Sequence, residues 1–376
     1  MDMILSVAIV VTLLTSLLLI VRFGKMRLTG TDPMPLMAFM AILFTSGLDV
    51  GLIMFPMTEF PVYETEDVYG FTNALAVEFG FWGFLVWGFY FLTTFYFCIV
   101  EPKVQLFEIR WVKLINSAVI IATCAFTGFL FLSYLPDYII GLSDTVRYVL
   151  VAVVVLMAVL SSTDIRYVKW LSIGSSALFF CLIALLWISS DVGVPGLLAS
   201  LSQLGGYFAN LPRFVHPVSD YHAFYLFWWF AWSIMIGQFV ARFVNGLRAY
   251  QLLTALLVIP SILIALWFSV LYVYHSRSIT LSNELQMCMV MVGVIFVVNS
   301  LDSLTRLYSE NLGLTVQRLG NAGYIGLHWT LLFSLILLYQ FTALKIEWIG
   351  LVVIGLYCAA YVLTFIRRDA LMQQTA

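Results

Sequence analysis

Residues 228–237 are Trp-Trp-Phe-Ala-Trp-Ser-Ile-Met-Ile-Gly, an apolar segment that is rich in tryptophan and ends in a glycine. A second apolar segment, residues 47–51, is Gly-Leu-Asp-Val-Gly, and Pro56 follows it. Each lies inside an apolar run of about 20 residues, the length that a helix needs to cross a hydrocarbon core of ~30 Å. The sequence therefore predicts two membrane-spanning helices that glycine interrupts near mid-membrane.

The composition extends this prediction to the whole chain. Of its 376 residues, 62% are hydrophobic and only 10% are charged, whereas roughly 25% are charged in ordinary soluble domains. This excludes a soluble enzyme and a disordered tail, and a net charge of −2 offers no basic surface for nucleic acid. The cysteines all fall in apolar runs, which is typical of small core residues and not of disulfides or a metal cluster. They are Cys98, Cys124, Cys181, Cys288 and Cys358.

The chain contains about eleven such runs, separated by charged residues or by proline and glycine. This predicts an all-α, polytopic membrane protein. The first run lacks a basic leading segment and an obvious cleavage site, so we expect a spanning helix there and not a signal peptide. The runs are residues 3–22, 36–56, 73–99, 112–135, 146–163, 168–189, 222–245, 250–274, 285–307, 324–342 and 347–366.

The two interrupted spans lie five spans apart, at corresponding positions of two five-helix halves with opposite topology. Paired glycine-interrupted helices point to an inverted-repeat secondary transporter whose site lies where those helices unwind. Glycines are also common packing positions in membrane helices. The predicted parts are a peripheral helix and cytoplasmic loop (1–35), a first repeat (36–189), an external loop with an interfacial helix (190–221), a second repeat (222–366) and a cytoplasmic tail (367–376).

The basic residues predict the orientation of the chain. If the loop at residues 22–35 is cytoplasmic, all but four of the 18 lysines and arginines lie on the cytoplasmic side. By the positive-inside rule, this predicts an inner (plasma) membrane protein with its N-terminus outside and its C-terminus in the cytoplasm. The four exceptions are Arg147, Arg213, Arg277 and Lys345, and the external loops are then acidic, notably at Glu59, Glu64, Glu66 and Asp67.

Aromatic residues gather on two of the predicted helices. Trp82, Trp87 and Tyr90 lie within about 140° of arc on one helix, at 100° per residue. Trp228, Trp229 and Trp232 lie within about 100° on the other, with Phe239 two turns further along. Two such faces would form a cage for a quaternary ammonium, which the face of an aromatic ring attracts. The alternative is an aromatic belt at the membrane interface or packing against lipid.

Acidic side chains at Asp49, Glu78 and Asp302 are predicted at membrane depth, where an ionisable group is costly and therefore a candidate for function. Asp49 lies in the expected unwound segment, where it would face a bound cation or carry a proton. Glu78 lies one turn before Trp82, and a functional and a structural role remain equally open for it. We interpret Asp302 as a structural acid that pairs with a nearby arginine or a helix terminus.

The sequence does not indicate an enzyme. It contains four histidines, and their spacing matches no metal-binding motif such as His-Glu-x-x-His. Neither a nucleophile motif such as Gly-x-Ser-x-Gly nor a phosphate-binding P-loop occurs in the sequence. ATP is therefore not the expected energy source.

With these residues in view, the chain resembles the betaine/choline/carnitine transporter family over nearly its whole length, as a shortened and divergent member. The most specific match is residues 228–242, which are similar to the family signature Trp-Trp-x-x-Trp-x-Pro-Phe-Val-Gly-x-Phe-Ile-Ala-Arg. Further matches are Phe23-Gly-Lys-Met-Arg-Leu, the glycine-rich residues 47–59, and Trp82-Gly with Trp87 and Tyr90. The resemblance implies a ten-helix inverted-repeat core of the sodium/amino-acid symporter type, loss of the family's first peripheral helix, and a trimer.

The resemblance also implies a site. Its central cage would consist of Trp82, Trp87, Tyr90 and Trp229, with Trp228, Trp232 and Phe239 along the exit path. The unwound segment would contain Gly47 and Gly51. A sodium ion would be held by backbone carbonyls of Thr45, Leu48 and Phe296 and by the side chains of Asn299 and Ser300.

The chain departs from the family pattern at several of these positions. Asn299 stands where the family has threonine, Ile234 replaces the signature proline, Phe81 replaces a histidine, and Asp49 replaces the middle glycine of Gly-x-Gly-x-Gly. A fixed charge on Asp49 would repel the carboxylate of betaine or carnitine and favour a pure cation such as choline, unless Asp49 binds a proton. We therefore expect a cationic quaternary amine or proton-linked uptake.

Two functions remain open at this point. The first is a secondary active transporter of a small quaternary ammonium compound (choline, betaine or a related osmolyte), coupled to sodium or protons and working by alternating access. The second is a transporter-derived protein that does not transport, acting as a membrane sensor or as a subunit with a separate membrane partner. We expect no cofactor other than a sodium ion.

Overall fold

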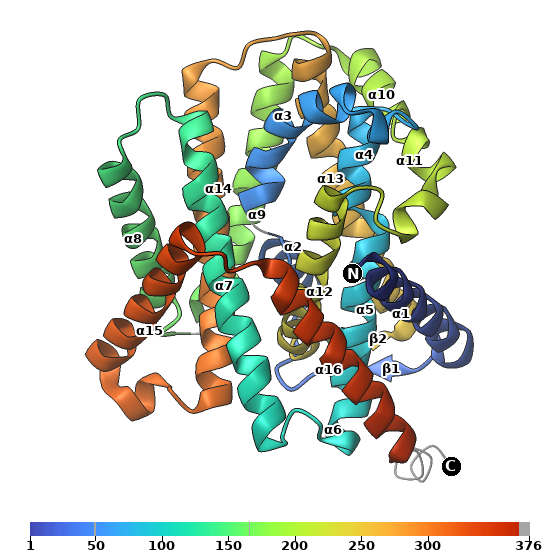
Figure 1. Cartoon of the computed structure of the whole chain (residues 1–376), viewed down its shortest axis with the longest axis vertical. Coiled ribbons are helices and arrows are strands. Elements are labelled where there is room, and N and C mark those ends of the chain that lie inside the picture. The colour runs from blue at the N-terminus through green and yellow to red at the C-terminus, as the bar shows by residue number, and fades with distance from the viewer. Residues whose placement is uncertain (49, 165, 368–376) are drawn as a thin grey trace.

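The computed structural model describes residues 1–48, 50–164 and 166–367, most of them in helices (Figure 1). Two short strands, β1 (Arg27–Leu28) and β2 (Leu247–Arg248), pair antiparallel. The helices are α1 (Asp2–Phe23), α2 (Leu36–Ser46), α3 (Val50–Thr65), α4 (Ala74–Trp82), α5 (Trp87–Phe95), α6 (Glu101–Val104), α7 (Arg110–Tyr138), α8 (Asp144–Ser161), α9 (Arg166–Ser189), α10 (Val194–Ser202), α11 (Gly205–Ala209), α12 (Asp220–Ala241), α13 (Ala249–Ser276), α14 (Asn283–Leu312), α15 (Val316–Phe341) and α16 (Ile346–Ile366).

The predicted all-α, polytopic architecture is confirmed. Among the described residues, 10 helices are long and apolar enough to cross a membrane, and the bent pair α2 and α3 would be an eleventh. The predicted second span is this pair, whose axes differ by 49°. The predicted loop at 190–221 contains two short helices, α10 and α11, where we expected one.

Helices that lie five spans apart make equivalent contacts. The contact between α2 and α9 corresponds to the contact between α12 and α16. In the same way, the contact between α8 and α14 corresponds to the contact between α15 and α7. Likewise, α3 packs against α13 as α12 packs against α5. Two five-helix halves with the same internal packing, related by a two-fold axis, would give this pattern. The long helices α7 and α14 pack against each other in the middle of the molecule, while α1 lies at its edge (Figure 1).

The predicted third span is also broken, which the sequence analysis did not anticipate. Gly83 has an extended backbone (φ −108°, ψ 170°) and ends α4 after Trp82. A 3-10 turn at Phe84–Val86 then leads into α5, which begins at Trp87. The aromatic residues of this span therefore belong to two successive helical segments.

The expected break in the seventh span is wrong, because α12 is one continuous helix from Asp220 to Ala241. Ile234 occupies the position of the signature proline, and unlike proline it keeps the backbone N–H that the helix requires. Gly237 instead allows close packing. A Cβ atom there would lie 2.2 Å from Oγ1 of Thr93 in α5, so this glycine is a small-residue contact between helices.

Gly237→Ala is expected to destabilise the protein by about 1–3 kcal/mol, because the methyl group would force α12 away from α5. The backbone carbon of Thr93 would also lie only 2.8 Å from the new atom, so a rotamer change cannot relieve the overlap. Thermal unfolding of the detergent-solubilised protein measures the loss. Gly355→Ala in α16 is the matched control, since its Cβ would have no neighbour within 4 Å. Equal melting temperatures for the two variants would contradict this account.

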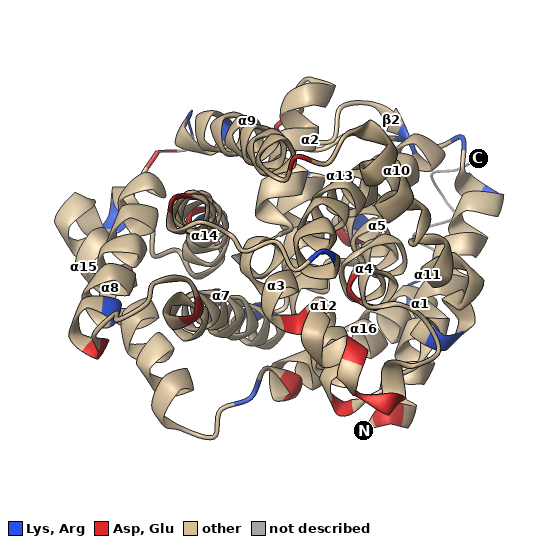
Figure 2. Ribbon diagram, turned by 90° about the horizontal axis from the view of Figure 1, so that it is seen from above, with Lys and Arg blue, Asp and Glu red and all other residues tan. Residues whose placement is uncertain are grey.

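Acidic residues mark one end of the bundle. The first turns of α1, α8, α12, α14 and α16 each contain an acid, where a helix N-terminus favours negative charge. The N-termini of these helices point toward the viewer in Figure 2, which looks onto the end predicted to be external, although α1 and α16 begin about half-way along the molecule (Figure 1). The residues are Asp2, Asp144, Asp220, Glu284 and Glu347.

Candidate substrate site

A small cavity lies where the predicted cage residues meet the break between α2 and α3. The space that the centre of a water molecule can occupy is about 10 Å³, roughly what a single water needs. A larger molecule would therefore enter only if aromatic side chains moved apart. The cavity is lined by Gly47, Leu48, Trp82, Tyr90, Trp228, Trp229 and Trp232.

The rings around this cavity meet mostly edge to face. Trp82 lies 5.4 Å from Trp228 and 5.9 Å from Trp229 between ring centroids, with interplanar angles of 81° and 84°. Tyr90 lies 5.6 Å from Trp229 on another side. Edge-to-face contacts of this kind are favourable, and the electron-rich faces of such rings attract organic cations.

Hydrogen bonds hold three of these aromatic side chains in place. The indole N–H of Trp229 donates to the carbonyl of Phe81 at 2.7 Å and so links α12 to α4. The hydroxyl of Tyr90 donates to the carbonyl of Gly47 at 3.2 Å, at the end of α2. The indole N–H of Trp87 donates to the carbonyl of Trp82 at 3.0 Å, across the break at Gly83.

Three indoles that line the cavity are held less firmly. The N–H groups of Trp82, Trp228 and Trp232 are buried and have no hydrogen-bond partner among the described residues. A buried polar group without a partner is costly. These three side chains can therefore reorient at a lower cost than Trp229.

The other predicted site residues lie elsewhere or outside the described chain. Trp87 lies behind Tyr90 and Trp229, at ring distances of 5.1 and 6.1 Å, and does not line the cavity. Phe239 packs against Phe243 at 5.1 Å, further along α12. Asp49 lies outside the described residues. Trp228 and Trp232, expected on an exit path, line the same cavity as Trp82.

The break after α2 lies against the cage because residue 47 is a glycine. A Cβ atom at Gly47 would lie 2.8 Å from the carbonyl oxygen of Leu43 and 3.3 Å from the ring of Tyr90. A larger residue would therefore separate the break from the aromatic rings. Gly51 is buried near the start of α3, past the break.

The residues predicted to hold sodium are all buried, and the structure brings α2 and α14 together there. The hydroxyl of Ser300 donates to the carbonyl of Leu48 at 2.9 Å. The amide of Asn299 instead contacts two α9 hydroxyls, those of Ser172 and Ser175, at 3.3–3.4 Å. The predicted residues are Thr45, Leu48, Phe296, Asn299 and Ser300.

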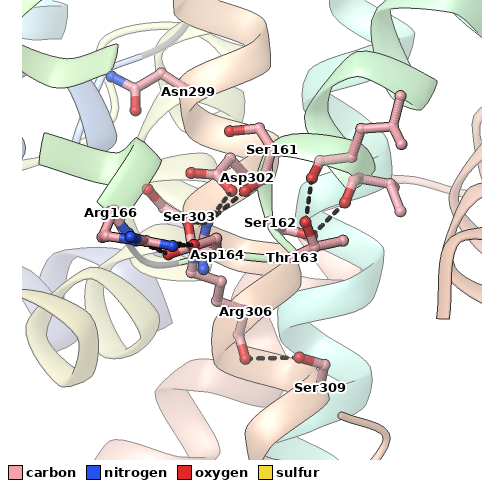
Figure 3. Close-up of polar contacts among 12 residues, drawn as sticks. Ser161, Ser162, Thr163, Asp164, Arg166, Asn299, Asp302, Ser303, Arg306 and Ser309 are labelled. Atoms are coloured by element: carbon pink, nitrogen blue, oxygen red, sulfur yellow. Dashed lines mark hydrogen bonds and ion pairs between the residues drawn. The ribbon is translucent and has the colours of Figure 1, made fainter. Parts of the chain in front are cut away.

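The prediction for Asp302 is confirmed. Its carboxylate pairs with Arg306 one turn later on α14, at 3.0 Å, and the acid is 0% exposed. The guanidinium also donates to the carbonyls of Ser161 and Asp164 at 2.6 Å each, which ties α14 to the segment between α8 and α9 (Figure 3). Beside it, Arg166 lowers the pKa of the exposed Asp164 carboxyl to about 2 by hydrogen bonding.

The predicted position of Glu59 in an external loop is wrong. Glu59 lies inside α3 and is only 4% exposed. Its carboxyl group accepts hydrogen bonds from Tyr221 and from Tyr225, the latter at 3.0 Å. Glu78 in α4 is 0% exposed and belongs to the same group of side chains. An acid that pairs with distant tyrosines leaves no local signal in the sequence.

The fold and the site define a multi-pass, all-α membrane protein with an aromatic cavity beside a broken span. The sequence model of the BCCT family, described as betaine/carnitine/choline family transporter, matches residues 111–276. The glycine betaine transporter OpuD of Bacillus subtilis is 25% identical over 300 residues, which cover 66% of this chain and 57% of that protein. A glycine betaine/proline/choline transporter of Vibrio parahaemolyticus is 22% identical over 323 residues, covering 67% and 56%.

These matches confirm the resemblance to the betaine/carnitine/choline transporter family. The chain spans about half the length of the curated relatives it matches. Among solved structures, a Na⁺-coupled sialic acid symporter in a substrate-bound, outward-open state matches with a TM-score of 0.47. It shares 16% identity, and the match covers 98% of this chain and 82% of that one.

Proposed function

We propose that the chain is a secondary active transporter of a small quaternary ammonium compound, such as choline, betaine or a related osmolyte. The observation that carries this proposal is the buried aromatic cavity beside the break between α2 and α3. Most of its lining residues are aromatic, and the face of an aromatic ring attracts an organic cation without a fixed charge. The curated relatives named for betaine or choline support the same substrate class.

The geometry suggests how the chain binds and encloses its substrate. Trp229 and Tyr90 are fixed by hydrogen bonds to backbone carbonyls and form a rigid wall. Trp228 and Trp232 can turn, because their N–H groups have no partner to lose among the described residues. The cation would enter as these rings move aside and would be covered when they return. Rocking of one five-helix half against the other would then change the side from which the cavity is reached.

The chemistry of the buried oxygens fits a coupling sodium ion in part. The carbonyl of Leu48 and the hydroxyl of Ser300 lie side by side at the break, and neutral oxygens of this kind are ligands for hard cations. The amide of Asn299 would have to leave the α9 serines to join them. A sodium ion would supply positive charge that draws α2 and α14 together. Proton coupling is the alternative.

Uptake into proteoliposomes tests the proposal. Purified protein is reconstituted, and accumulation of radiolabelled choline and betaine is measured with a sodium gradient, a proton gradient or neither. Accumulation above the level without a gradient supports a secondary transporter and identifies its ion. Preference for choline over betaine would support the inference that Asp49 selects a pure cation. Absence of both binding and uptake would contradict the proposal.

A non-transporting sensor or subunit is the second candidate, and the unbroken helix α12 favours it. Without a hinge at the signature proline position, the second half has less freedom to open the cavity. Binding of choline without flux would support a sensor, and copurification with a stoichiometric membrane partner would support a subunit. We also propose an inner-membrane location, an external N-terminus and a homo-oligomer, for which the family resemblance suggests a trimer.

A further inference from the structure

Two carboxyl groups are buried together above the aromatic cavity. Glu59 in α3 and Glu78 in α4 are 4% and 0% exposed, and their carboxyl groups are within hydrogen-bonding reach of each other. Among the described residues, no lysine, arginine or histidine forms an ion pair with either of them. Two ionised carboxylates cannot share such a site, since desolvation and mutual repulsion both oppose it.

Hydrogen-bond donors distinguish the two acids. Glu59 accepts from the hydroxyls of Tyr63 at 2.6 Å, of Tyr225 at 3.0 Å and of Tyr221. Three donors satisfy an ionised carboxylate that is buried from bulk solvent. Glu59 is therefore the anion of the pair.

Glu78 has fewer donors than Glu59: besides the shared hydroxyl of Tyr63, only the indole N–H of Trp82 among the described residues is near enough to interact with it. Its Oε2 lies 2.9 Å from the hydroxyl of Tyr63, but a hydroxyl has only one hydrogen, and the shorter contact gives that hydrogen to Glu59. The oxygen of Tyr63 must then accept from Glu78, which requires a proton on Glu78. The other carboxyl oxygen, Oε1, is fully buried and has no partner among the described residues.

This pair connects the outside of the bundle with the aromatic cavity. A larger cavity lies on the outer side, and the centres of water molecules can occupy about 500 Å³ of it. It is lined by Glu59 and Tyr221 and by the exposed side chains of Val62 and Glu66. On the inner side, the ring of Tyr225 lies 5.5 Å from that of Trp82 and 5.6 Å from that of Trp228. Glu78 also lies one helical turn before Trp82.

Other titratable groups around the pair carry little positive charge. Those that face it are Glu66 and Tyr69 after α3, Tyr134, Asp137 and Tyr138 in α7, and the three tyrosines that bond Glu59. From α13, His275 pairs with Glu64 at 3.0 Å. Arg213 lies 4.9 Å from the ring of Phe71, and His222 accepts from the backbone N–H of Val218.

We propose that Glu78, held against the Glu59 carboxylate, is a proton-binding site that exchanges its proton for an organic cation in the aromatic cavity. A positive charge beside Trp82 stabilises the ionised form of Glu78, so binding of the cation releases the proton to the water of the outer cavity. Conversely, protonation of Glu78 weakens binding of the cation. This inference rests on the proposed quaternary ammonium site and assigns its pH dependence to one residue.

Calorimetry of choline binding to the purified protein, in buffers with different heats of ionisation, counts the protons released. We expect close to one proton released per choline bound at pH values where Glu78 is protonated, and none from Glu78→Gln. The wild-type Kd should rise by about tenfold from high to low pH, with a slope of at most about tenfold per pH unit. In Glu78→Gln the Kd should no longer change with pH.

Glu66→Gln is the matched control, because Glu66 lines the same outer cavity but lies outside the pair. It should keep both the proton release and the pH dependence, and thermal unfolding verifies that both variants are folded. Proton release that persists in Glu78→Gln would overturn the proposal, as would choline binding to the wild type without proton release. Failure of the wild type to bind choline at any pH would overturn the proposed function as well.

Discussion

Replacing Trp229 with alanine is expected to weaken choline binding by at least about 30-fold and to abolish uptake. A desolvated cation–π contact contributes about 2 kcal/mol or more, and Trp229 contacts the rings of Trp82 and Tyr90 at 5.9 and 5.6 Å. The substitution also removes the hydrogen bond to Phe81. Binding is measured by equilibrium dialysis with radiolabelled choline, and uptake is measured in proteoliposomes.

One further variant separates the ring from the hydrogen bond, and a second is the matched control. Trp229→Phe keeps an aromatic face but lacks the N–H, so it should bind choline within about tenfold of the wild type. Trp348→Ala in α16 removes the same side chain from a position that is 51% exposed and should not affect binding. If Trp229→Ala bound choline as tightly as Trp348→Ala, the aromatic cavity would not be the substrate site.

The sequence predicted part of this cavity because helical periodicity is a local property. Trp228, Trp229 and Trp232 share one face of an unbroken helix, so their spacing alone brings them to one side. Trp82 and Tyr90 also reach the cavity, but Trp87 does not. The extended backbone at Gly83 resets the helical phase between Trp82 and Trp87, and a helical wheel drawn through both residues cannot show this.

The buried acids show a second limit of sequence analysis. Asp302 and Arg306 are one helical turn apart, so their pairing could be predicted from spacing. Glu59 accepts from Tyr225 of α12, 166 residues further along the chain, and Glu78 in α4 contacts Tyr63 of α3. Only packing of α3, α4 and α12 brings these groups together. Hydropathy alone placed Glu59 in a loop, although it lies within a helix and is buried.

Arg306→Met is expected to destabilise the protein by about 3–5 kcal/mol, the usual cost of removing one partner from a buried ion pair. It would leave the carboxylate of Asp302 buried without a positive partner and would deprive the carbonyls of Ser161 and Asp164 of a donor. The loss should appear as a lower melting temperature in detergent. Because these contacts join α14 to the segment between α8 and α9 (Figure 3), faster proteolysis within that segment should accompany it.

The double variant Asp302→Asn with Arg306→Met should recover part of this loss, because it leaves no buried charge unpaired. Arg166→Gln is the matched control, since Arg166 pairs with Asp164 at 2.6 Å beside the same segment but its side chain is 84% exposed. An exposed pair of this kind contributes at most about 1 kcal/mol. Equal losses for Arg306→Met and Arg166→Gln would show that the buried pair does not hold α14 to this segment. A greater loss in the double variant than in Arg306→Met alone would show that the two carbonyls, and not the charge on Asp302, make Arg306 necessary.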